Sequence, residues 1–110
     1  MSLTEKDSQY LWHPYTQHKT ASAPIAITKG KGALLWDEND KEYIDAIASW
    51  WVNPYGHSNS FIAEAIYKQL TTLEHVLFGG FTHEPAVVLA EKLMAILPKK
   101  KQKLFFSDNG

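Results

Sequence analysis

The stretch IAITKGKGALLWDENDKEYID, residues 25–45, decides the fold of this sequence. It holds three short runs of β-favouring residues with turn-forming residues between them. The runs are Ile25–Ile27, Ala33–Trp36 and Glu42–Asp45, and the separators are Gly30–Gly32 and Asp37–Asp40. Such an alternation is typical of consecutive hairpins. We therefore expect a three-stranded antiparallel meander.

An aromatic segment precedes the meander, within residues 1–24. Its centre is the run from Tyr10 to Tyr15, which contains Trp12, His13 and Pro14. Proline disfavours helix at the residue before it. We expect an arm that docks through its aromatic side chains.

A loop and a first helix are expected after the meander. Residues 46–57 contain Trp50 and Trp51 and are too rich in Pro, Gly and aromatic residues to be regular throughout. From Phe61 to Leu73 apolar residues recur at helical spacing, and Ser58–Ser60 can supply the N-cap.

A second helix and a short strand are expected near the C-terminus. Thr82 can cap the helix, with Glu84 and Pro85 in its first turn. Residues 103–107 form an apolar run with the character of a strand, which leads into the turn residues 108–110. The fold class expected for the whole sequence is α/β.

Composition excludes several classes of function. The 110 residues are 45% hydrophobic and 21% charged, as in globular proteins. A net charge of -1 gives no electrostatic footprint for nucleic acid or an anionic membrane. There is no cysteine, and no apolar run has the length of a signal peptide or a membrane span. We expect a cytoplasmic protein without nucleic-acid or membrane partners.

The local signals for chemistry each allow two interpretations. The turn Asp108-Asn109-Gly110 could begin a phosphate site or be only a turn. Trp50 and Trp51 could line a pocket or fill an interface. The five histidines show neither an i, i+4 helical pair nor a cysteine partner, so no metal site is predicted.

Four separated motifs, in the same order along the chain, carry a resemblance to a known family. They are Trp12–Thr16, Ala48–Trp51, His75–Ala86 and Phe105–Gly110. Together they resemble the class-III pyridoxal-phosphate-dependent aminotransferases, and within them the adenosylmethionine-8-amino-7-oxononanoate aminotransferase family, also called 7,8-diaminopelargonic acid synthases. The Trp-His-Pro-Tyr and double-Trp motifs favour this family over ornithine and 4-aminobutyrate aminotransferases.

The resemblance implies the N-terminal segment of a fold-type I enzyme, normally a homodimer that binds pyridoxal 5'-phosphate. Such enzymes transfer an amino group from S-adenosylmethionine to 8-amino-7-oxononanoate, giving 7,8-diaminononanoate in biotin biosynthesis. The implied segments are an arm (residues 1–24), the meander with its double-Trp loop (25–57), and two helices with the first strand of the cofactor-binding large domain (58–110).

The same resemblance assigns roles to individual residues. Tyr15 would contact the keto substrate and stack on the adenine of the donor, and Trp50 would form a wall of the substrate pocket with Trp51 as its neighbour. Gly110 matches a glycine whose backbone amide holds the cofactor phosphate. In the dimer, Gly79 and Gly80 match a segment that approaches the partner subunit's site.

The residues that perform the chemistry in this family are expected beyond residue 110. They are the Schiff-base lysine, the acid paired with the pyridine nitrogen and the substrate-binding arginine. None of the eleven lysines here matches the catalytic position. We therefore expect the 110-residue chain alone to contain no catalytic residue, to be inactive and not to retain the cofactor. We also expect it to self-associate, because Trp50, Trp51 and the segment from Phe78 to Phe81 would normally pack against parts of the enzyme beyond this sequence.

Two alternatives remain open at this stage. One is a related class-III aminotransferase with another substrate. The other is a non-enzymatic oligomerisation or binding module that uses the aromatic arm to hold a partner.

Overall fold

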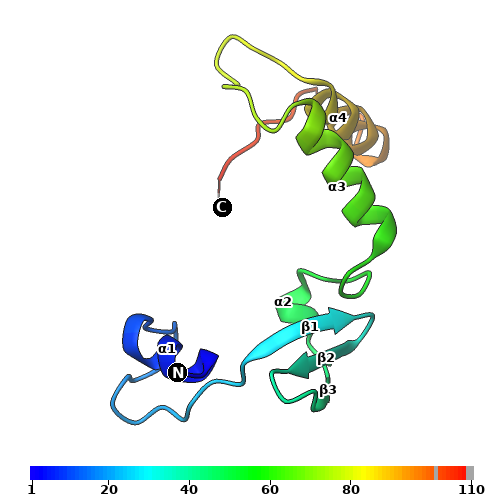
Figure 1. Cartoon of the computed structure of the whole chain (residues 1–110). Coiled ribbons are helices and arrows are strands. Elements are labelled where there is room, and N and C mark those ends of the chain that lie inside the picture. The colour runs from blue at the N-terminus through cyan, green and yellow to red at the C-terminus, as the bar shows by residue number, and fades with distance from the viewer. Residues whose placement is uncertain (101, 109–110) are drawn as a thin grey trace. The chain divides into compact units, whose positions relative to one another are not determined.

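The computed structural model describes residues 1–100 and 102–108 of the chain. These residues fall into two compact units, residues 1–66 and residues 67–110. The elements of the described residues, labelled in Figure 1, follow in chain order as α1 (Leu3–Tyr10), β1 (Ile27–Lys31), β2 (Leu34–Asp37), β3 (Glu42–Ile44), α2 (Ala48–Trp51), α3 (Ser60–Thr72) and α4 (Glu84–Ile96).

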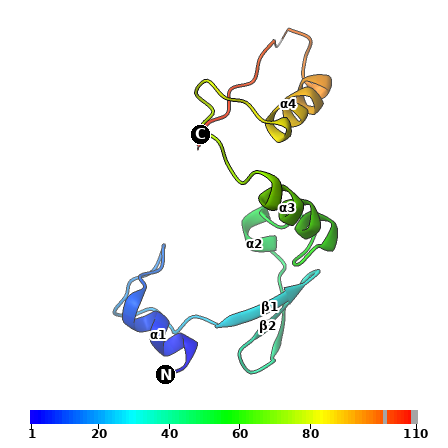
Figure 2. The same ribbon diagram turned by 45° about the horizontal axis from the view of Figure 1, so that its top comes forward.

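The predicted meander is confirmed. The strand order is β1-β2-β3 and both pairings are antiparallel, with Gly30 opposite Leu35 and Leu34 opposite Ile44. The neighbouring arrows of β1 and β2 are also visible from the direction of Figure 2.

The predicted boundary of the first strand was wrong. β1 runs through Gly30, which the sequence placed in a turn, and the chain turns instead at Gly32, whose φ is +59°. Gly30 belongs to the strand because it pairs with Leu35 of β2, and the His57 side chain lies against it. A β-carbon built on Gly30 would lie 2.9 Å from His57 Cβ, so only glycine fits there.

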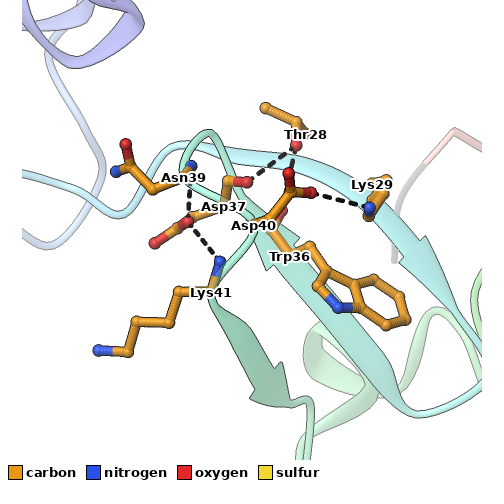
Figure 3. Close-up of polar contacts among 7 residues, drawn as sticks. All are labelled: Thr28, Lys29, Trp36, Asp37, Asn39, Asp40 and Lys41. Atoms are coloured by element: carbon orange, nitrogen blue, oxygen red, sulfur yellow. Dashed lines mark hydrogen bonds and ion pairs between the residues drawn. The ribbon is translucent and has the colours of Figure 1, made fainter.

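The turn between β2 and β3 is organised by the carboxylate of Asp37. Its Oδ1 accepts the backbone N–H groups of Asn39 and Lys41 at 2.9 and 3.0 Å, and its Oδ2 accepts the Tyr43 hydroxyl at 2.8 Å. Figure 3 shows both backbone hydrogen bonds. Burial acts to raise the pKa of Asp37, but the hydrogen bonds from Tyr43, Asn39 and Lys41 outweigh it and hold the pKa below its ordinary value.

Side chains from β1 tie the first strand to this turn. The Thr28 hydroxyl donates to the carbonyl groups of Trp36 and Asp37, and Lys29 Nζ lies 2.9 Å from Asp40 Oδ1 (Figure 3). Asp40 itself has a φ of +59°. Polar contacts thus hold β1 against the turn between β2 and β3.

The arm begins with α1, a helix that the sequence analysis did not predict. Ser2 and Glu5 form a capping box in which each side chain accepts the backbone N–H of the other residue, at 3.2 and 2.7 Å. Two otherwise unpaired N–H groups are satisfied in this way. The helix ends at Tyr10, ahead of the predicted aromatic break.

The N-cap predicted for α3 is confirmed, and the one predicted for α4 was wrong. Asn59 Oδ1 accepts the N–H of Ile62 at 3.2 Å and caps α3. The N-cap of α4 is His83, not Thr82. A cap at Thr82 could not use the N–H three residues later, because Pro85 at that position has none.

The strand predicted over residues 103–107 is also absent. Residues 102–108 carry no strand in the structure. A strand requires a hydrogen-bonded neighbour, and every described strand belongs to the first unit.

No hydrophobic residue among the described ones is buried. Large apolar side chains are exposed instead, with Phe61 82% and Ile44 76% exposed. None of the described helices has the length and apolar character that a membrane span needs.

We expect Asp37→Asn to lower the midpoint of thermal unfolding by a few degrees at neutral pH. Asparagine keeps the shape of the side chain but loses the charge that strengthens three hydrogen bonds. The measurement is thermal unfolding of the complete product of the gene that contains this sequence, with and without the substitution.

The effect of Asp37→Asn should depend on pH in one direction. The folded-state pKa of Asp37 lies below its ordinary value, so its stabilisation is present above the unfolded-state pKa of about 4 and is lost as the pH falls through the folded-state value. The two unfolding midpoints should therefore converge in acid. A difference that stays constant into acid would contradict this role.

Candidate functional site

The double-tryptophan loop contains a backbone feature that the sequence did not predict. Ala48, Ser49, Trp50 and Trp51 all have positive φ, at 47°, 52°, 59° and 66°. α2 is therefore a single left-handed turn, closed by a hydrogen bond of 3.1 Å from the Trp51 N–H to the Ile47 carbonyl. For L-residues this conformation costs about 1–2 kcal/mol each. Such strain persists only where the surrounding structure determines it.

The carboxylate of Asp45 holds the start of this turn. Its Oδ1 accepts the N–H of Ile47 at 3.2 Å, and its Oδ2 lies 3.4 Å from Ser49 Oγ and 2.6 Å from His57 Nε2. Because a carboxylate only accepts hydrogen bonds, Nε2 of the ring carries the shared hydrogen. The two side chains are nearly enclosed, with exposed fractions of 6% for Asp45 and 16% for His57.

The pKa of Asp45 reflects these contacts. The hydrogen bond from His57 lowers the pKa, burial acts to raise it, and the N–H of Ile47 lowers it further. The net result is a pKa below the ordinary value, so Asp45 is a carboxylate at neutral pH.

His57 is fixed to the sheet by its own backbone. Its N–H donates to the Gly32 carbonyl at 2.8 Å, and its carbonyl accepts the Gly32 N–H at 3.0 Å. The neighbouring Ser58 hydroxyl donates to the Gly30 carbonyl at 2.7 Å. Gly56, with a φ of +84°, passes so close that a β-carbon on it would lie 2.9 Å from Gly32 Cα.

The structure brings together two of the predicted substrate residues, Tyr15 and Trp50. Their ring centroids lie 5.6 Å apart at an interplanar angle of 57°. Tyr15 is 90% exposed and Trp50 is 63% exposed, so most of both side chains remains open. Trp51 is 85% exposed and contacts no aromatic ring among the described residues.

Local hydrogen bonds shape the arm next to Tyr15. Trp12 Nε1 donates to the Thr16 carbonyl at 3.2 Å, and the Thr16 hydroxyl donates to the His13 carbonyl at 2.6 Å. Tyr15 lies inside this turn with a φ of +57°. The aromatic arm therefore presents Tyr15 from a closed turn.

The second unit contains the predicted Gly79 and Gly80. Gly80 has a φ of +93°, a conformation that favours glycine, whereas Gly79 does not have a positive φ. Next to them, Phe78 meets the rings of His83 and Phe106 with centroid distances of 5.5 and 6.1 Å. These rings help to line an apolar hollow.

Two further predictions concern the ligands of a cofactor or metal. Gly110, the predicted phosphate contact, lies outside the described residues. Within residues 1–100 and 102–108, no three His, Cys, Asp or Glu side chains form a group that could hold a metal ion.

Sequence reasoning missed Asp45 and His57. Asp45 ends the third predicted strand and His57 follows a glycine, but nothing in their spacing links them. The signal that could have drawn attention to them is chemical: an acid and a histidine flank the one loop that carries two adjacent tryptophans.

Comparison with known proteins places the chain in context. Residues 15–110 match the family model described as aminotransferase class-III. The chain is 52% identical over 101 residues to the adenosylmethionine-8-amino-7-oxononanoate aminotransferase of Synechococcus elongatus, covering 92% of this chain and 24% of the relative. It is 44% identical over 110 residues to the enzyme of the same name from Staphylococcus aureus, covering 98% of this chain and 24% of that relative. The chain thus spans about a quarter of the length of these relatives.

Solved structures of aminotransferases are also similar to this chain. The enzyme of this name from Methanocaldococcus jannaschii superposes with a TM-score of 0.82 and 40% identity, covering 88% of this chain and 23% of that one. An omega transaminase of Pseudomonas jessenii in complex with PMP superposes with a TM-score of 0.81 and 39% identity, covering 89% of this chain and 22% of that one. The chain therefore has the fold of the corresponding part of fold-type I aminotransferases.

We expect Gly56→Ala to destabilise the protein more than Gly32→Ala does. Both glycines have positive φ, at +84° and +59°, so both substitutions carry the cost of a left-handed L-residue, about 1–2 kcal/mol. Only at Gly56 would the new β-carbon also meet backbone, at 2.9 Å, whereas nothing lies within 4 Å of one at Gly32. Thermal unfolding of both variants of the complete gene product measures the difference. Equal losses would mean that the loop does not lie against the hairpin in this way.

Proposed function

The chain belongs to the class-III aminotransferases, and we propose that it is the N-terminal part of an enzyme that transfers an amino group from S-adenosylmethionine to 8-amino-7-oxononanoate. The product of this reaction is 7,8-diaminononanoate, an intermediate of biotin biosynthesis. The names of the relatives from Synechococcus elongatus and Staphylococcus aureus support this choice of substrates.

The contact between Tyr15 and Trp50 carries the proposal. Two segments far apart in the sequence, the arm and the left-handed turn, bring their rings to a centroid distance of 5.6 Å and leave most of both side chains exposed. Aromatic faces suit an aliphatic keto-acid chain and an adenine ring. In the proposal Tyr15 contacts both substrates, Trp50 forms a wall of the pocket, and Trp51 is its neighbour.

The cofactor of the proposed enzyme is pyridoxal 5'-phosphate, which supplies an electron sink for the carbon that exchanges its amino group. Among the described residues, no buried side-chain N or O atom lacks a hydrogen-bond partner, and the proposal assigns the phosphate contact to the backbone. The part of the site that the proposal assigns to this chain is Gly110, whose backbone amide would hold the phosphate.

The assembly in the proposal is a cytoplasmic homodimer without nucleic-acid or membrane partners. Gly79 and Gly80 would approach the partner subunit's site. The positive φ of Gly80 supports a requirement for glycine in this segment.

A second candidate function is transamination with another amino donor. The observation in its favour is the Pseudomonas jessenii omega transaminase, whose TM-score of 0.81 nearly equals the 0.82 of the Methanocaldococcus jannaschii enzyme. The two candidates share the reaction and differ in the substrate that the aromatic wall receives.

The proposal predicts that the complete gene product forms 7,8-diaminononanoate from 8-amino-7-oxononanoate with S-adenosylmethionine as the donor. Tyr15→Ala and Trp50→Ala should each raise the KM for a substrate about tenfold, equivalent to losing about 1.4 kcal/mol of aromatic contact. Asp40→Asn is the control, because that carboxylate is 82% exposed and pairs only with Lys29 in the described contacts. It should leave KM unchanged.

The donor decides between the two candidate functions. Amino transfer from other amines but not from S-adenosylmethionine would favour the second candidate. A complete gene product, loaded with pyridoxal phosphate, that transfers no amino group from any donor would contradict both.

A further inference from the structure

We infer that Asp45 and His57 are positioning residues of the substrate wall: they hold residues 48–51 in the left-handed turn and thereby place Trp50 against Tyr15. This inference rests on the proposed function, in which Trp50 contacts the substrate. Asp45 and His57 themselves act through Trp50 and not on the reacting atoms.

The first step is the set of hydrogen bonds that Asp45 makes to the turn. One carboxylate oxygen accepts the N–H of Ile47, the residue before the turn, and the other lies 3.4 Å from the hydroxyl of Ser49, a residue within it. The backbone N–H of Asp45 donates to the Ala33 carbonyl at 2.8 Å, next to the sheet. Asp45 therefore connects the sheet directly to the beginning of the turn.

The second step is the fixed position of His57. Its backbone is paired with Gly32 in both directions, and its side chain packs on Gly30 of β1. The ring nitrogen meets the Asp45 carboxylate at 2.6 Å, which is short for a hydrogen bond from nitrogen to oxygen. The loop is thus fixed to the sheet at both ends, through Asp45 before the turn and His57 after it.

The third step links this pair to the wall. Trp50 belongs to the turn that Asp45 holds, and its ring meets Tyr15 at 5.6 Å. An isolated stretch of L-residues would leave the left-handed conformation. If the hydrogen bonds of Asp45 to the turn are lost, the direction of the Trp50 side chain should change. The Trp50 ring would then no longer form the same wall of the substrate pocket with Tyr15.

Asp37 provides the matched control. It is a second enclosed aspartate of the same meander, its carboxylate accepts two backbone N–H groups and a hydroxyl, and its pKa is also lowered. Its contacts lie in the β2–β3 turn, and none of them reaches Tyr15 or Trp50. Asp37→Asn should therefore lower the stability of the protein without changing the position of Trp50.

The experiment uses the complete gene product and four variants: Asp45→Asn, His57→Leu, His57→Gln and Asp37→Asn. The Asp45→Asn substitution replaces the charged acceptor of the His57 hydrogen bond with a neutral amide, and leucine in place of His57 removes the ring donor. Glutamine restores an N–H near the position of Nε2 and serves as the conservative replacement.

Steady-state kinetics should separate positioning from stability. We expect Asp45→Asn and His57→Leu to raise the KM for 8-amino-7-oxononanoate roughly tenfold or more, while kcat changes less than about threefold, as for loss of binding that is common to ground and transition states. The KM and kcat of His57→Gln should stay close to those of the unsubstituted protein. Asp37→Asn should lower the unfolding midpoint and leave KM unchanged. A KM that rises equally in the Asp37 and Asp45 variants would overturn the inference.

A double-variant cycle tests whether Asp45 acts through Trp50. The KM of Asp45→Asn combined with Trp50→Ala should lie within about twofold of Trp50→Ala alone, because residues that act as a unit are not additive. If the two effects multiply, Asp45 acts by another route and the inference fails.

A spectroscopic measurement keeps the inference separate from the proposed function. Near-ultraviolet circular dichroism reports the Tyr15 and Trp50 ring contact without catalysis, and Trp50→Phe identifies its contribution. Asp45→Asn should lose the same signal, and Asp37→Asn should keep it. If the complete gene product is inactive, the proposed function is contradicted. The circular dichroism signal still tests whether Asp45 positions Trp50, because it does not depend on catalysis. Retention of the full signal in Asp45→Asn would refute the positioning role even in an active enzyme.

Discussion

The contact between the Asp45 carboxylate and the His57 ring is the interaction on which the rest of the first unit depends. It spans 2.6 Å and joins the end of the meander to the end of the double-tryptophan loop. The contacts that the described residues make with one another in this region are mainly polar. Backbone pairing and two enclosed carboxylates, Asp37 and Asp45, provide these contacts, one carboxylate at each end of the meander. A buried carboxylate is tolerated only when its hydrogen bonds are made, and both residues satisfy this condition.

Local sequence predicted those features whose cause is local. The β-favouring runs and turn residues indicated the meander, and the acceptor at Asn59 lies in the predicted capping segment. The errors arose where a distant residue or a missing hydrogen decided the outcome. Gly30 remains in β1 because it pairs with Leu35 of β2, and Pro85 cannot give Thr82 an N–H that a cap would use. The capping-box pattern of Ser2 and Glu5 is present in the sequence, but the polar residues 6–9 follow it instead of an apolar periodic run, so α1 was not predicted.

The candidate site was predictable in its residue types but not in its geometry. Resemblance to a family pointed to Tyr15 and Trp50, and the structure brings their rings into contact. The left-handed turn could not be predicted, because Ala48-Ser49-Trp50-Trp51 contains neither glycine nor asparagine, the residues that favour positive φ. The pairing of Asp45 with His57 depends on the fold and not on spacing along the chain, so the sequence could not indicate it.

The strain of the turn explains why such a support is needed at this position. Glycine would adopt positive φ at no steric cost, but it would remove the tryptophan ring from the wall. Four L-residues in this conformation keep the ring and carry a cost of about 1–2 kcal/mol each, which the surrounding contacts must offset. An enclosed carboxylate that is fixed on both sides by the sheet offers directional hydrogen bonds to do this, which apolar contacts do not. A strained turn beside a charged, nearly enclosed pair is therefore the expected way to hold a large aromatic side chain at a position that the backbone alone would not maintain.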